Sequence, residues 1–151
     1  MRRAWLGKAT RFAHLPAPAS VVPSDSTAVT DLFPARFAGS TVAGNWLDRI
    51  TVHGLGTPRS VVAGVHQGGI VVTDEGDFTL WIPRTDITNI RTGRGIAGDV
   101  AEPDGMVIIT WTLGDTSIDT GLRITQNSHH EMFFTSATNL LATGVRNGEQ
   151  Q

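Results

Sequence analysis

Residues 106–124, MVIITWTLGDTSIDTGLRI, carry the clearest structural pattern in the chain. From Val107 to Leu113 every second residue is apolar, which places these side chains on one face of a β-strand. The alternation resumes after Gly114-Asp115, a two-residue loop of the kind that suits a primed hairpin turn. This turn predicts a set of cross-strand pairs, which are Leu113 with Thr116, Trp111 with Ile118 and Val107 with Leu122 on the core face, and Thr112 with Ser117 and Thr110 with Asp119 facing water.

Length and composition exclude several classes of protein. The 151 residues suffice for one domain with a core and some tail. A net charge of -2 offers no field to attract nucleic acid, so we expect no nucleic-acid partner. The absence of Cys excludes disulfides, thiolate metal sites and thiol catalysis. No apolar run approaches the roughly 18 residues that a membrane-spanning helix needs, and no signal-peptide core follows the start.

The first twelve residues form a basic arm. All ionised side chains before Asp25 are cations, which give the arm a charge of +4 and leave -6 for the rest of the chain. Cations mixed with Trp suit the headgroup region of an anionic membrane, whereas the alternative is a disordered basic tail. The predicted membrane-contact residues are Arg2, Arg3, Trp5, Lys8 and Arg11.

Four segments are expected along the chain. The basic arm, residues 1–12, is followed by residues 13–34, which contain four prolines and little that packs and therefore predict a semi-extended linker. Residues 35–145 form the folded domain, and residues 146–151 form a polar tail.

Within the domain, alternating or apolar segments separated by turn residues predict further strands. Near the C-terminus the apolar residues change from a period of two to helical spacing. This indicates a helix of about four turns, with a capping box at Ser128 and Glu131 and a stop at Gly144. Seven strands and one C-terminal helix predict a mainly β, pleckstrin-homology (PH)-like bent antiparallel barrel capped by the helix; the alternative is a split barrel or sandwich with an appended helix. The first five strands are expected at Arg36–Val42, Ser60–Val65, Ile70–Thr73, Phe78–Ile82 and Ile87–Arg91.

Two short motifs match catalytic or nucleotide-binding signatures. Residues 93–98 read GRGIAG and satisfy G-x-G-x-x-G, but Pro103 follows too soon for the helix that a dinucleotide site needs, so we expect no nucleotide. These glycines instead predict a bent strand or a close backbone contact. Asp119-Thr120-Gly121 matches the triplet of aspartic proteases, which makes a homodimeric hydrolase using Asp119 the alternative function.

No other pattern supports catalysis or a metal site. His129 and His130 are neighbours on the predicted helix and do not face one another, so they form a poor metal pair. We therefore expect no metal, no cofactor and no enzymatic activity.

The segment from Trp46 to Arg59 is too long for a tight turn and too apolar for an ordinary solvated loop. A long loop of this kind is often functional, although its apolar residues can also simply cap the core. It offers few cations, and phosphate recognition requires clustered ones, so strong phosphoinositide binding is not expected. The predicted binding residues are Trp46, Arg49, His53 and Arg59, with Arg94 nearby.

Four segments together resemble a family of actinobacterial PH-like-domain proteins: GNWLDR (44–49), HGLG (53–56), GRGIAG (93–98) and DTGLR (119–123). The resemblance covers roughly residues 36–142. Members typically carry one N-terminal transmembrane helix, a basic juxtamembrane stretch and a Pro/Ala linker before this domain, and some are labelled putative transporters or export proteins. The resemblance implies no catalytic residues.

From the arm and the resemblance we expect a non-enzymatic binding or scaffold module whose partner is a protein or an anionic lipid surface. We expect it at the cytoplasmic side of the cell membrane if a transmembrane helix precedes Met1, and in the cytoplasm otherwise.

Overall fold

The computed structural model describes residues 14–45, 48–74, 76–93, 95–96, 99–100 and 105–150, with the backbone alone for 95–96, 99–100 and 143–150. The predicted strands are all present, and their boundaries differ from the expected ones by at most three residues. The elements are β1 (Phe33–Val42), β2 (Arg59–His66), β3 (Gly69–Thr73), β4 (Thr79–Pro83), η1 (Arg84–Asp86), β5 (Ile87–Gly93), β6 (Gly95–Ile96), β7 (Asp99–Val100), β8 (Met106–Leu113), β9 (Thr116–Ile124) and α2 (Asn127–Gln150).

β8 and β9 form the predicted hairpin in the predicted register. Trp111 lies opposite Ile118, and Thr110 lies opposite Asp119. Gly114 begins the turn with φ at 63°, a backbone angle that glycine adopts without steric cost. The hairpin therefore follows from its local sequence alone.

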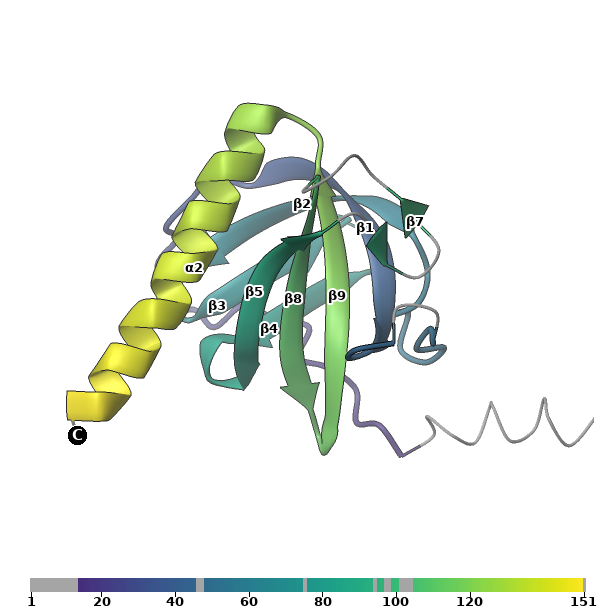
Figure 1. Cartoon of the computed structure of the whole chain (residues 1–151), viewed down its shortest axis with the longest axis horizontal. Coiled ribbons are helices and arrows are strands. Elements are labelled where there is room, and N and C mark those ends of the chain that lie inside the picture. Colours follow the sequence, from purple (N-terminus) through teal and green to yellow (C-terminus); the bar gives the residue numbers. More distant parts are fainter. Residues whose placement is uncertain are drawn as a thin grey trace, which may run out of the picture.

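Seven strands form one antiparallel sheet in the order β4-β3-β2-β1-β9-β8-β5. β1 pairs with both β2 and β9, so the first strand joins the two halves of the sheet. The sheet curls around a single main core (Figure 1). The expected fold class, mainly β with seven antiparallel strands and one C-terminal helix, is confirmed, and the seven strands belong to one continuous sheet.

The helix α2 lies along the open side of the curled sheet (Figure 1), where it contacts β2, β5 and β9. Phe133 and Ala137, at helical spacing, have no exposed surface and join the main core. This arrangement matches the expected helical cap. Within the described residues no helix combines the length and the apolarity that crossing a membrane requires.

Both predicted ends of α2 are wrong. The first helical bond runs from the His130 N–H to the Gln126 carbonyl at 2.9 Å, so Gln126, rather than Ser128, occupies the N-cap position. The helix also continues through Gly144 to Gln150. A glycine costs a helix only about 1 kcal/mol relative to alanine, which does not end a helix by itself.

The second face of the β8–β9 hairpin is less open to water than predicted. Ile108 and Asp119, both on that face, are each only 4% exposed. A bulge between Phe37 and Gly39 places Ala38 in a small outer cluster with Ile108, and β6 also contacts β1 and β9. Coverage by segments distant in sequence explains why local alternation missed this.

Residues 14–31 are bound to the domain, although their composition predicted a linker with little that packs. Leu15 is 3% exposed and belongs to the main core. The Trp81 N–H of β4 donates to the Ala19 carbonyl at 2.9 Å, and the Val29 N–H donates to a β2 carbonyl at 2.7 Å. A proline-rich extended backbone still offers carbonyls and some N–H groups to a sheet, and composition does not show that.

The glycine-rich connection after β5 contains the short antiparallel pair β6 and β7, which was not predicted. Within the described residues no helix begins in this connection. A Cβ on Gly93 would lie 2.7 Å from the Ile108 side chain. The Ile108 side chain therefore packs closely against Gly93.

Candidate functional site

The β1–β2 loop, residues 43–58, contains most of the predicted binding residues, and its apolar side chains anchor it to the barrel. Ile50 and Leu55 have no exposed surface and belong to the main core. The Ile50 N–H donates to the Ser40 carbonyl at 2.9 Å. The loop therefore caps the core, as the alternative interpretation of its sequence predicted, while its polar residues remain near the surface.

Arg49 holds the middle of the loop together. Its guanidinium donates to the carbonyl of Gly56. The chain is so tight here that a Cβ on Gly56 would lie 2.1 Å from the Ile50 carbonyl oxygen. Gly39 on β1, with φ at 105°, faces the same contact, because its Cβ would lie 3.1 Å from both Arg49 Nη1 and the Gly56 oxygen. Glycine at 56 and 39 thus permits the close approach of loop and strand.

His53 connects the loop to the N-terminal segment. Its Nε2 lies 2.8 Å from the Leu15 carbonyl oxygen. The His53 backbone has φ at 59°, in the left-handed region that non-glycine residues rarely adopt. The imidazole is therefore used inside the molecule, at the point where Leu15 enters the core.

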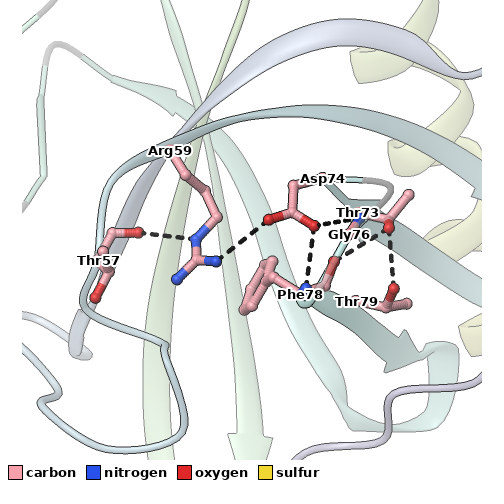
Figure 2. Close-up of polar contacts among 7 residues, drawn as sticks. All are labelled: Thr57, Arg59, Thr73, Asp74, Gly76, Phe78 and Thr79. Atoms are coloured by element: carbon pink, nitrogen blue, oxygen red, sulfur yellow. Dashed lines mark hydrogen bonds and ion pairs between the residues drawn. The ribbon is translucent and has the colours of Figure 1, made fainter.

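Arg59, the first residue of β2, lies beside the β3–β4 turn (Figure 2). Its Nη1 is 3.4 Å from Asp74 Oδ2, and its guanidinium carbon is 4.3 Å from the centre of the Phe78 ring. A Cβ on Gly54 would lie 3.5 Å from Arg59 Nη2, so the residue after His53 packs against the same guanidinium. The structure thus brings the loop, Arg59 and the β3–β4 turn together.

Asp74 organises that turn. Its Oδ1 accepts hydrogen bonds from the N–H groups of Gly76 at 2.8 Å and Phe78 at 3.0 Å. These bonds, that from Phe78 first and then that from Gly76, lower the pKa of Asp74 below its usual value. Burial opposes them, and Arg59 lowers the pKa through smaller contributions. Asp74 is therefore ionised at neutral pH and holds Arg59 over Phe78.

Asp119 forms a second polar centre, at the start of the loop. Its Oδ2 accepts from the Gly44 N–H at 3.2 Å and from Arg91 Nη2 at 3.3 Å. The Thr110 hydroxyl donates to Oδ1. One buried carboxylate therefore links β5, β8, β9 and the β1–β2 loop.

Comparison with known proteins gives the family of the chain. The family model described as bacterial PH domain-like matches residues 13–138. The chain belongs to this family. No curated protein matches it. Family and fold together indicate a binding or scaffold module.

In this PH-like domain the three described side chains predicted to bind a ligand make internal contacts. Arg49 bonds to Gly56, His53 lies against Leu15, and Arg59 pairs with Asp74. In the part of the chain that the structure describes, no group of three or more His, Asp or Glu side chains forms a metal site.

The same contacts account for Asp119 without hydrolysis. In this PH-like domain the residue lies in the middle of β9, 4% exposed, and accepts from three donors. Aspartic proteases instead need two carboxylates that share a proton across a dyad. Nothing in the described residues supports the hydrolase alternative.

Sequence reasoning missed two residues that the structure of this PH-like domain places in the site. Asp74 and Phe78 were assigned only to a turn and a strand, although the spacing of an Asp before Gly76 is itself a signal for a side-chain-stabilised turn. The predicted residues outside the described ranges are Trp46, Arg94, Arg2, Arg3, Trp5, Lys8 and Arg11.

Proposed function

We propose that this chain is a non-enzymatic PH-like module that works at the cytoplasmic face of the cell membrane and binds a protein partner through the surface of the β1–β2 loop. The family match and the fold support the binding role. The choice of a protein over a phosphorylated headgroup rests on one observation. The side chains of Arg49, His53 and Arg59 make contacts within the domain.

The contacts of Arg59 are the main support for a protein partner. A guanidinium that receives a phosphate needs its N–H groups aimed at the ligand, often in a bidentate arrangement. Here Arg59 is directed to Asp74 and stacked on Phe78, and its Nε is 3.5 Å from the Thr57 carbonyl. An anionic headgroup would have to displace the Asp74 carboxylate. A loop held in place in this way instead suits a protein partner, because a preformed surface loses little entropy on binding.

Membrane association is assigned to the basic arm, residues 1–12. Each Lys or Arg near an anionic surface contributes about 1 kcal/mol, and Trp favours the interface. The proposed contacts are those predicted from the sequence, which are Arg2, Arg3, Trp5, Lys8 and Arg11. The described domain begins after this arm, so the two roles are separable by truncation.

Vesicle co-sedimentation tests the membrane half. The full chain should bind vesicles of phosphatidylcholine and phosphatidylserine, and a chain that lacks residues 1–12 should not. A full-length variant with Arg2, Arg3, Lys8 and Arg11 changed to Gln should behave like the truncated chain, which separates charge from length. Equal binding by all three proteins would remove the arm from the proposal.

Calorimetric titration with inositol trisphosphate tests the ligand class. We expect no saturable binding to the full chain at micromolar concentrations. Binding that is lost in Arg59→Gln would instead assign the β1–β2 loop to a phosphorylated headgroup and overturn the choice of a protein partner.

A further inference from the structure

A groove runs between residues 28–31 and the first half of α2. Its volume is about 560 Å³, and Val29 forms part of one wall and Met132 part of the other. A second hollow of about 380 Å³ shares Val29 and reaches Leu140 and Arg84. The groove is separate from the β1–β2 loop, and neither the fold nor the proposed function uses it.

The groove exposes apolar side chains. Val29 is 50% exposed and Met132 is 53% exposed, and both belong to the four large apolar residues that the described part of the chain leaves exposed. A third, Leu32, directly follows the segment that forms one wall. Exposed apolar side chains gathered in a hollow indicate a contact surface for another peptide segment.

The first hollow, between residues 28–31 and α2, is lined by negative charge. Asp31 on one wall and Glu131 on the other are its only ionisable lining residues. The second hollow, which shares Val29 and Ser136 with the first, is lined by one cation, Arg84. The groove therefore suits a segment that combines apolar side chains with cations.

We propose that this groove binds the chain's own basic arm, residues 1–12, within the same molecule. The arm has a charge of +4 and carries Trp5 and Leu6 between its cations, with Phe12 after the last one, whereas the remaining residues have a charge of -6. Cations placed beside Asp31 and Glu131 would leave the apolar side chains of the arm for Val29 and Met132.

The length of the arm permits this contact. The described chain begins at His14, whose Nε2 is 3.6 Å from Asp115 in the β8–β9 turn. Thirteen extended residues reach up to about 45 Å, and a domain of this size has a radius of gyration of about 14 Å. Because the reach shortens toward His14, the first residues of the arm, which include Arg2, Arg3 and Trp5, are the ones that can extend to the groove. The arm would then have two competing binding sites, the groove and an anionic membrane. The membrane site rests on the proposed function, whereas the groove contact does not.

Fluorescence anisotropy without lipid tests the groove contact. The probe is a labelled peptide of residues 1–12, and the protein is the chain without these residues, which keeps every described element. We expect saturable binding at low salt. The full chain should bind the peptide at least tenfold more weakly, because its own arm is present at a high effective concentration.

Matched variants of the truncated chain locate the site. Asp31→Lys with Glu131→Lys should weaken peptide binding at least tenfold, and Met132→Ser should weaken it severalfold without a change of charge. Asp77→Lys, in the exposed β3–β4 turn, changes the charge by the same amount per residue as each groove reversal and should alter binding less than twofold.

The proposal is overturned by absent peptide binding, by equal binding to the full and truncated chains, or by equal effects of the groove and control variants. Vesicle binding by the arm is measured separately, so a failure of the membrane role leaves this result unaffected.

Discussion

The β1–β2 loop is held near each end by an aspartate and an arginine, and the two carboxylates differ in burial. At the start of the loop Asp119 has a side chain 5% exposed and accepts from Gly44, Thr110 and Arg91, although the Arg91 side chain itself is 45% exposed. At the end Arg59 and Asp74 have side chains 25% and 24% exposed. Removing a buried acceptor leaves its donors without a partner, which costs more than losing a partly exposed ion pair. The start of the loop is therefore the more firmly held.

The two ends of the loop also differ in how many segments their contacts join. The Asp119 contacts bring together four segments that are distant in sequence, so breaking them disturbs the sheet itself. The contacts of Arg59 involve the β3–β4 turn, Phe78 and the neighbouring Thr57 carbonyl. We therefore expect the Arg59 end of the loop to open more readily than the Gly44 end.

The largest expected effect is that of Asp119→Ala. It removes the acceptor of the Gly44 N–H, the Thr110 hydroxyl and Arg91, and should lower the free energy of unfolding by about 3 kcal/mol. Urea denaturation measures this change. Asp119→Asn, which keeps one acceptor oxygen, should cost less, and Asp115→Ala in the exposed turn should change stability by less than about 0.5 kcal/mol. A cost for Asp119→Ala equal to the turn control would abolish the distinction between the two ends.

An intermediate effect is expected for Arg59→Met. The variant keeps an apolar stem over Phe78 but loses the cation–π contact and the ion pair, which should cost about 1 kcal/mol. Amide hydrogen exchange should accelerate at residues 54–57 and remain unchanged at Gly44. Equal acceleration at both ends would show that the loop opens as one unit.

The smallest expected effect is on how stability changes with pH in acid. The pKa of Asp74 is lowered in the folded state, so its stabilising contribution is present above pH 4 and disappears as the pH falls through the folded value. Asp74→Asn should therefore show a shallower loss of stability below pH 4 than the unaltered chain, as measured by thermal unfolding between pH 2 and pH 6. An identical acid profile would mean that the Gly76 and Phe78 bonds do not favour the charged form.

The β8–β9 hairpin was predictable to the residue because its information is local. Alternation fixes which side chains share a face, and Gly114 fixes the turn and thereby the register. The same reasoning placed Asp119 opposite Thr110. It did not place Gly44 and Arg91 around Asp119, because those contacts depend on how β1 and β5 pair with the hairpin across long sequence separations.

The candidate site was predictable only in part for the same reason. An apolar, cation-bearing segment identified the β1–β2 loop, but the partners of Arg59 come from a different turn. The binding of residues 14–31 also escaped prediction, since the contacts of Ala19 and Val29 with the sheet are made by backbone atoms that carry no sequence signal. Leu15 could be recognised as apolar, but not as a core residue.

The contact of Ala19 with β4 protects an edge of the sheet. β4 ends the strand order, and a bare edge strand offers unpaired backbone groups to any other chain. The bridge from Ala19 to Trp81 occupies part of that edge from within the molecule. Cleavage that released residues 14–20 would uncover this part of the edge, and we expect it to favour pairing between copies of the domain.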